Sequence, residues 1–227
     1  MGTPKNYIGE RSRMRNGLYA EVISQNGCMD ISVRFENGTI KDHVRHDDFL
    51  RGNVHSPMVY TDCGDYMTGY NPNTKWKHVF MFDASDFGKV AVAEFWYTNS
   101  NGYVLSSMAP ERKLHRYLLD APKGAMVDHK NGNPLDNRRY NIRICNHSDN
   151  VHNSKIPVTN TSGYKGVIWD KERNRWKAQI SLRGKTHKLG RYKNKIDAAC
   201  AYNMAAIKHF GEFARINQIP EEAENGY

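Results

Sequence analysis

The stretch VDHKNGNPLDNRRYNIRICNHSDNVHN gathers side chains that could carry out acid–base and metal chemistry. It runs from Val127 to Asn153 and holds seven asparagines and three histidines. A composition this polar could belong to a disordered tract. Four aliphatic residues interrupt it, however, and apolar residues at such intervals favour a folded segment: Val127, Leu135, Ile142 and Ile144.

The elements that must position these side chains follow from the local pattern. Residues 126–129 predict a short strand, residues 130–140 a turn-rich loop and residues 141–145 a second strand. A helix then begins, with Asn146 or Ser148 as its N-cap. In a hairpin packed on a helix, the end of the first strand faces the first turns of the helix.

Asp128 and His129 stand at that strand end, and Asn150 and Asn153 share one face of the predicted helix. This arrangement suits hydrolysis of a phosphodiester. A hard cation such as Mg²⁺ prefers oxygen ligands and keeps several waters. The carboxylate of Asp128 and the amide oxygen of Asn150 would bind it without neutralising it. His129 has a reference pKa near ~6.5, so much of it is neutral at pH 7 and can accept a proton from water.

The stretch resembles the HNH nuclease motif, the ββα-metal fold of phage and intron homing endonucleases. The likeness covers about residues 95–155, with the Asp-His pair, the loop LDNRRYNIR and the helical asparagine in order. The resemblance implies His129 as the general base and Asp128 and Asn150 as the metal ligands. It implies Asn141 as the asparagine that braces the loop. Asparagine rather than histidine at position 150 fits the magnesium-type branch, with Mn²⁺ as the alternative ion.

Two further readings concern residues around this motif. The pair His115-Arg116 matches a pair that often precedes the motif, and Arg116 would either clamp a phosphate or form a structural ion pair. A zinc site is the competing metal hypothesis, although the spacing of its three candidate ligands does not support it: Cys145, His147 and His152.

Charge and composition narrow the partners of the chain. It has 227 residues and a formal charge of +9, and residues 157–227 hold 13 of its 33 lysines and arginines against 7 of its 24 acidic residues. A localised basic surface suggests a polyanion partner, most often nucleic acid, and a solvated basic face without a partner is the equal alternative on charge alone.

No apolar run approaches the ~18 residues of a membrane span, and the N-terminus lacks an apolar signal core. The four cysteines are scattered without a CxxC pair. These features predict a reduced, cytoplasmic protein without a membrane partner. The resemblance to phage and homing endonucleases implies that a bacterial host or a phage encodes it.

The first half of the chain predicts a small β module and the start of the nuclease domain. In residues 1–56, Ile31, Val33 and Phe35 alternate with polar residues, and Asn37-Gly38 signals a hairpin. We expect a small β-barrel or curled sheet of SH3-like size there, serving either docking or stability. Residues 57–75 are rich in Gly, Asn, Pro and Asp and predict a linker. The nuclease domain spans 76–156, with strands at 77–82, 89–98 and 102–107 and a short helix at 111–119.

The last part of the chain predicts a separate sheet-and-helix module. A linker at 157–162 precedes residues 163–217, which predict a three-stranded antiparallel sheet packed on one helix; residues 218–227 are an acidic tail. Along the central strand, apolar residues from Trp176 to Leu182 alternate with polar ones, and Asn194 is the expected N-cap of the helix. The polar face carries Lys177, Gln179, Ser181 and, at the turn, Arg183. A basic sheet face of this kind can enter a major groove.

This module resembles the Apetala-two (ethylene-response-factor) DNA-binding domain, through GYKGV, LG-Y, DAACAYN and FARIN. Several arginines of the plant pattern are replaced, so the target sequence does not transfer. The resemblance maps the reading face to six residues: Lys165, Gln179, Ser181, Thr186, Lys188 and Arg191.

These patterns and resemblances predict a modular α+β fold. They predict that the protein is a metal-dependent HNH endonuclease that cuts double-stranded DNA. The resemblance implies 5′-phosphate and 3′-hydroxyl ends. A homing or phage-borne nuclease is the first expected setting and a restriction enzyme the second. The alternative from a different class is a non-catalytic DNA-binding regulator with a relic nuclease fold.

Overall fold

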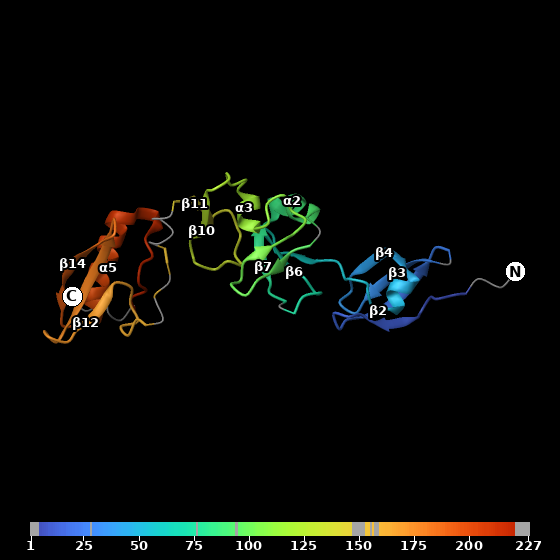
Figure 1. The fold of residues 1–227 in the computed structure, drawn as a ribbon, viewed down its shortest axis with the longest axis horizontal. Coiled ribbons are helices and arrows are strands. Elements are labelled where there is room, and N and C mark those ends of the chain that lie inside the picture. Colours follow the sequence, from blue (N-terminus) through green and yellow to red (C-terminus); the bar gives the residue numbers. More distant parts are fainter. Residues whose placement is uncertain are drawn as a thin grey trace. The chain divides into compact units, whose positions relative to one another are not determined.

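The computed structural model describes residues 5–27, 29–75, 77–93, 95–146, 153, 154, 156 and 159–220. The fold is mixed, with several small sheets and few helices (Figure 1). It separates into two compact units, residues 1–121 with 133–142, and residues 122–132 with 143–227. The stretch expected to form one nuclease domain, 76–156, is therefore divided between the two units.

The first unit begins with a four-stranded antiparallel sheet in the order β1-β2-β3-β4. The strands are β1 (Arg11–Arg13), β2 (Tyr19–Gln25), β3 (Asp30–Phe35) and β4 (Ile40–Arg45), followed by α1 (His46–Leu50). The alternating Ile31, Val33 and Phe35 are buried in its core as expected. Within the described residues β1 does not pair with β4, so the sheet is open and the expected barrel does not close.

The prediction of a linker at 57–75 is wrong for residues 59–70. Strands β5 (Val59–Asp62) and β6 (Tyr66–Tyr70) form a hairpin, and β6 pairs in turn with β7 (Phe80–Asp83). Gly69 belongs to the sheet rather than to a loop. A Cβ at this position would lie 2.8 Å from the ring of Phe80 and 2.9 Å from that of Tyr60, so the aromatic packing requires a glycine. The close packing of the two rings, and not chain flexibility, therefore explains the glycine at position 69.

The strand expected at 89–98 is also wrong over most of its length. The chain forms a 3₁₀ turn η1 (Ala84–Asp86) and helix α2 (Phe87–Val92) before the short hairpin β8 (Tyr97–Thr98) and β9 (Val104–Leu105). Val90 is buried whereas Val92 is 78% exposed, so these two residues do not share the inward face that alternation in a strand would give them. The expected helix at 111–119 is present but shorter, as α3 (Leu114–Leu118).

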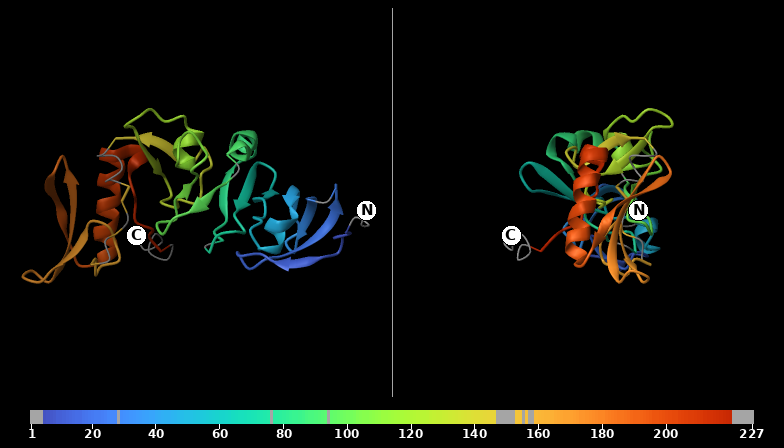
Figure 2. Two further views of the ribbon diagram at one scale, coloured as in Figure 1. Left: turned by 45° about the vertical axis from the view of Figure 1, so that its right-hand side comes forward. Right: turned by 90° about the vertical axis from the view of Figure 1, so that its left-hand side faces the viewer.

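The second unit contains two small sheets and the longest helix (Figures 1 and 2). Strands β10 (Met126–His129) and β11 (Ile142–Cys145) pair with each other. Strands β12 (Val167–Asp170), β13 (Arg175–Leu182) and β14 (Lys185–Tyr192) form a three-stranded antiparallel sheet, followed by α5 (Lys195–Phe210) and the turn η2 (Gly211–Phe213).

Helix α5 packs along one face of the β12-β13-β14 sheet, as both views of Figure 2 show. Asn194 caps the helix, because its side-chain oxygen accepts the backbone N–H of Ile196. Gly166 adopts a φ of +74°, and a Cβ there would lie 2.0 Å from the Tyr202 ring. A glycine is thus required where α5 crosses the start of β12.

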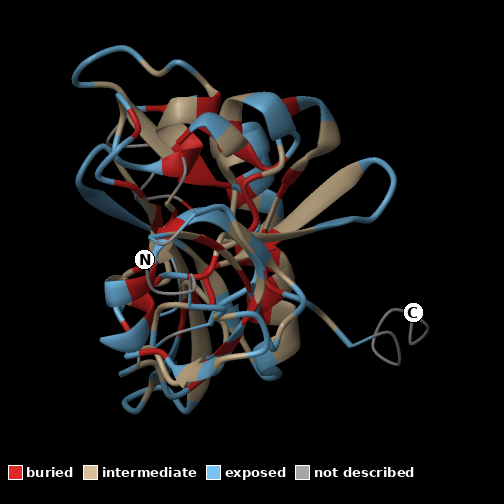
Figure 3. Ribbon diagram, turned by 90° about the vertical axis from the view of Figure 1, so that its right-hand side faces the viewer, coloured by how far each residue is buried: buried red, intermediate tan, exposed pale blue. Residues whose placement is uncertain are grey.

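Figure 3 shows buried residues within strands and helices and exposed residues on many of the connecting loops. Among the described residues, no helix is both long enough and apolar enough to span a membrane. Cys63, Cys145 and Cys200 carry free thiols.

Candidate active site

The end of β10 places two ionisable side chains in the interior. Asp128 and His129 are only 9% and 5% exposed. The strand stops there because the chain turns immediately afterwards. Gly132 has a φ of +69°, and its backbone N–H donates to the His129 carbonyl at 2.8 Å. This turn fixes the strand end and therefore the position of both side chains.

The Asp128 carboxylate is held by two neighbours that the sequence did not assign to it. Arg143 on β11 donates from Nη2 at 2.9 Å and from Nε at 3.3 Å to Oδ2. Asn153 donates from Nδ2 to Oδ2 at 2.8 Å and to Oδ1 at 3.0 Å. The same amide also donates to the His129 carbonyl at 2.9 Å. Asn153 therefore ties both residues of the Asp-His pair to the segment that follows β11.

Arg143 is itself buried, and its other side contacts the segment after α5. Its Nη1 donates to the Glu212 carbonyl, and the guanidinium lies 3.9 Å from the centroid of the Phe213 ring. The arginine thus makes two ion pairs, with Asp128 at 2.9 Å and with the Glu212 carboxylate at 3.8 Å, besides one backbone hydrogen bond and one cation–π contact. We name Asp128, Arg143, Asn153 and Phe213 the carboxylate cluster.

Residues 133–142, which follow β10, belong to the first unit and are braced by side chains within it. Asn141 is buried and donates from Nδ2 to the Asp136 carbonyl at 2.7 Å. Asp136 forms an ion pair with Arg138 at 2.8 Å. Arg139 forms another with Asp86 at 2.7 Å, and this bond raises the pKa of the guanidinium. Asn141 lies where a loop-bracing residue is expected.

Other residues of the expected site lie elsewhere. Asn150, together with His147 and His152 of the zinc alternative, falls outside the described residues. Arg116 belongs to the first unit, where its Nε donates to Glu111 at 2.9 Å. This contact lowers the pKa of the Glu111 carboxyl and favours the structural ion pair over a phosphate clamp.

The oxygen atoms of Asp128 decide what kind of divalent cation this site could bind. In the described part of the chain, no group of three or more His, Cys, Asp and Glu residues could hold a metal. Oδ2 of Asp128 accepts three hydrogen bonds there and Oδ1 accepts one, which leaves Oδ1 lone-pair capacity for a cation. A single carboxylate oxygen suits a hard ion that keeps most of its waters. The adjacent Arg143 guanidinium competes electrostatically and should weaken its binding.

On the face expected to read DNA, polar residues of β13 lie opposite polar residues of β14. Across β13 and β14, Lys177 pairs with Arg191, Gln179 with Lys188, and Ser181 with Thr186. We name these six residues the sheet face. The opposite face packs in the core through Ala178 and Ile180.

Three of the cations expected to bind DNA differ in their surroundings. Arg191 pairs with Asp170 at 2.8 Å, which lowers the pKa of that carboxyl. Arg183 lies in the β13–β14 turn at a φ of +50°. Lys165 precedes β12 and is half-buried, away from the strands, with its ammonium 2.8 Å from the Ser154 carbonyl.

Arg143 and Phe213 are the functional candidates that the sequence did not reveal. Alternation in β11 predicts that Ile142 and Ile144 point inward and Arg143 outward. In the structure Ile142 and Arg143 are buried, whereas Ile144 is 49% exposed. Asp128, on the neighbouring strand of the hairpin, was the signal in the sequence that could have identified Arg143 as buried, because a buried arginine requires an anion.

Known proteins similar to this chain include an HNH endonuclease, and the match to the family covers Asp128 and His129. The family model for HNH endonucleases matches residues 120–152. The chain is 31% identical over 149 residues to an uncharacterized HNH endonuclease of Acanthamoeba polyphaga mimivirus, covering 63% of this chain and 77% of that protein. It is 36% identical over 94 residues to Protein 3.8 of Escherichia phage T7, covering 41% of this chain and 77% of that protein. No solved structure matches the chain.

The chain belongs to the HNH endonuclease family, which confirms the resemblance of the Asp-His stretch. Nucleases of this family act on DNA and generally use divalent metal ions.

Proposed function

We propose that this protein is a sequence-directed DNA endonuclease in which His129 is the general base and one divalent metal, Mg²⁺ or Mn²⁺, is the cofactor. The observation that carries the proposal is the buried Asp128–His129 pair at the end of β10, inside the segment that matches the family. A buried acid and base at a strand end are costly to maintain without a function.

In the proposed reaction, His129 accepts a proton from a water molecule. The water oxygen forms a bond to phosphorus while the bond from phosphorus to the 3′ oxygen breaks. The leaving oxygen takes up a proton from solvent, giving 3′-hydroxyl and 5′-phosphate ends. A divalent cation, when bound, supplies positive charge that stabilises the phosphate oxygens.

The chain's own residues then divide the work. Asp128 would hold the cation through Oδ1, with Asn150 as the proposed second ligand. Arg143 and Asn153 orient the Asp128 carboxylate through the hydrogen bonds described above. Asn141 keeps the loop between β10 and β11 in one conformation. Arg143, Asn153 and Asn141 are thus positioning residues. Asp128 and Asn150 would contact the metal directly.

We propose that residues 163–217 form an Apetala-two-like module that binds double-stranded DNA through the sheet face. The cross-strand register supports this, because it gathers three cations and three neutral hydrogen-bonding residues on one side. Residues 1–56 and 76–156 remain the proposed accessory and nuclease domains. The viral relatives support a phage-borne or homing nuclease acting in the host cytoplasm, with a restriction enzyme second.

Cleavage of supercoiled plasmid with and without Mg²⁺ tests the function. Wild-type protein should nick or linearise the plasmid only when the metal is present. His129→Ala should slow cleavage about 10²–10⁴-fold, the usual effect of removing a general base. His209→Ala, at the exposed end of α5, is the matched control and should cut normally. A His129→Ala variant that cuts at the wild-type rate would refute the assignment.

The second candidate function is a DNA-binding regulator with an inactive nuclease fold. The sheet face alone would serve that role, since it contains no group needed for hydrolysis. Under this alternative the wild-type protein binds DNA but leaves the plasmid intact at every Mg²⁺ and Mn²⁺ concentration.

A further inference from the structure

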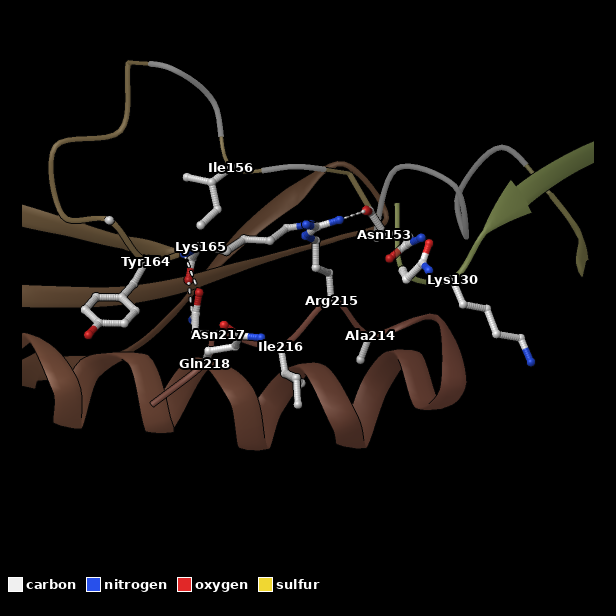
Figure 4. Close-up of a pocket in the computed structure, with 12 residues that line it drawn as sticks. Lys130, Asn153, Ile156, Tyr164, Lys165, Ala214, Arg215, Ile216, Asn217 and Gln218 are labelled. Carbon is white, nitrogen blue, oxygen red and sulfur yellow. Dashed lines mark hydrogen bonds between the residues drawn. The ribbon is translucent and has the colours of Figure 1, made fainter. Parts of the chain in front are cut away.

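The second unit contains a cavity of about 610 Å³ beside the carboxylate cluster. Four parts of the chain line it: the loop after β10, the residues Asn153 and Ile156, the turn from Gly163 to Lys165, and the segment from Ala214 to Gln218 (Figure 4). Its size is that of a site for a small molecule or one nucleotide unit.

The described residues that line this cavity carry charge of one sign. Their charged members are Lys130, Lys165 and Arg215, and no Asp or Glu is among these described lining residues. The Lys165 and Arg215 side chains converge inside the cavity, whereas Lys130 extends from the loop that follows His129 (Figure 4). Cations gathered in a concave site focus a positive potential, which favours an anionic ligand.

The cations are mounted on a rigid frame. The Lys165 backbone N–H donates to Oδ1 of Asn217 at 2.6 Å, and Nδ2 of Asn217 donates back to the Lys165 carbonyl at 3.1 Å. Asn217 is fixed in turn by Asn203 on α5, which accepts its backbone N–H at 2.7 Å. The position of Lys165 therefore does not depend on a ligand, which reduces the entropy lost on binding.

The environment of Lys165 carries a free-energy penalty that an anion would relieve. Burial, and then the nearby Arg215 charge, lower the pKa of its ammonium to about 8. Both effects disfavour the charged form. An anion between Lys165 and Arg215 would remove the repulsion and restore the charge of the lysine.

The cavity is connected to the carboxylate cluster through one residue. Arg215 donates from Nη1 to the Asn153 carbonyl at 3.5 Å, and the Asn153 side chain donates to Asp128. Lys130 directly follows His129. An anion bound in the cavity therefore lies beside the proposed site of hydrolysis.

We propose that this cavity binds a backbone phosphate of the DNA strand that is cut, next to the phosphate that is hydrolysed. The inference rests on the proposed function. A free phosphate ion would leave most of the cavity empty, whereas a phosphate within a strand brings its flanking sugars. Tyr164, Ile156 and Ile216 supply apolar surface for them.

The test is the salt dependence of DNA binding, measured by fluorescence anisotropy on the full chain. All proteins carry His129→Ala, and EDTA removes divalent metal, so binding is separated from cleavage. Each lost phosphate contact flattens the log–log salt slope by about 0.9. Arg215→Gln should show this change, and Arg215→Lys, which keeps the charge, should largely retain the wild-type slope. Lys208→Gln, on the exposed side of α5, is the matched control and should also retain it.

Equal slopes for Arg215→Gln and Lys208→Gln would overturn the proposal. A free-phosphate site would appear differently: inorganic phosphate, titrated by calorimetry, would bind wild type but not Arg215→Gln, while the DNA slope stayed unchanged. That result also overturns the assignment to the strand.

Circular dichroism and thermal unfolding of each variant show whether the fold is retained. If Arg215→Gln alters the slope although wild-type protein cuts no plasmid, the phosphate site stands and the nuclease proposal fails.

Discussion

The carboxylate cluster and the sheet face use charged residues in opposite ways. In the cluster, Asp128 and Arg143 are both buried and paired at 2.9 Å. On the sheet face, Lys188 is exposed and Lys177 half-buried, and among the described residues of this face it is Arg191 that forms an ion pair, with Asp170. The cluster fixes the geometry of two charges, whereas the sheet face leaves its charges available to a polyanion.

This contrast predicts where mutations act. Removing one partner of a buried ion pair leaves an uncompensated charge and typically costs about 3–5 kcal/mol. Exposed pairs typically contribute only about 0–1 kcal/mol. Changes in the cluster should therefore affect folding and catalysis, and changes on the sheet face should affect DNA affinity and sequence preference.

The largest expected effect is that of Arg143→Ala. This change leaves Asp128 buried beside Asn153 alone among its described partners and removes the contact with Phe213. We expect a loss of about 3–5 kcal/mol in the free energy of unfolding, measured with urea. Lys193→Ala, an exposed cation in the same unit, should stay within about 0.5 kcal/mol of wild type. A loss below 1 kcal/mol would show that the pair is not buried in solution.

A smaller effect is expected for Gln179→Ala on the sheet face. A side chain that forms a good bidentate contact to a base contributes about 1–3 kcal/mol of discrimination. The variant should therefore lose sequence preference while keeping the salt slope, because glutamine carries no charge. Competition binding on a randomised DNA library measures the preference. If the preference is unchanged, base readout belongs to another part of the chain.

The pH dependence of DNA binding tests Lys165, which belongs to neither region. Its pKa of about 8 in the free protein should rise when a phosphate lies between it and Arg215. Binding then takes up a proton, so affinity is complete below pH 8 and decreases above it, by up to about tenfold at pH 9. Lys130 and Arg215 are the other charged groups facing the cavity. Lys165→Arg stays charged and should remove this decrease; an identical pH profile in both proteins contradicts the linkage.

The smallest expected effect is a difference in the salt dependence of DNA binding between variants of two cations on the sheet face. Lys188→Gln should flatten the log–log salt slope by about 0.9, as expected for one phosphate contact. Arg191→Gln should change it less, because Asp170 at 2.8 Å already neutralises that guanidinium. Salt titrations of both variants under identical buffer conditions make the comparison. Equal changes would mean that Arg191 leaves Asp170 when DNA binds.

Local features of the structure could be predicted where they depend on neighbouring residues in the chain. The strand ending at His129, the turn after it and the Asn194 cap depend on contacts within a few residues. The apolar alternation along β13 likewise identified the buried face at Ala178 and Ile180. Such short-range preferences are encoded in neighbouring residues. The HNH family was recognised separately, from the resemblance of the motif residues.

Composition was misleading where distant contacts decided the outcome. Glycine at position 69 indicated a loop, but the rings of Tyr60 and Phe80 require it inside a sheet. The apolar run around Val90 indicated a strand, but in the structure it forms a short helix that buries Val90 and exposes Val92. In both cases tertiary packing overrode the local preference.

The sequence by itself determined the Asp128–His129 pair, its strand end and the basic character of the last 71 residues. Only the tertiary structure decided what surrounds the pair. Arg143 meets Glu212 across 69 residues of chain, and Arg215 meets Asn153 across 62. No local rule encodes such contacts, since a buried charge is stable only when a partner from elsewhere in the fold reaches it.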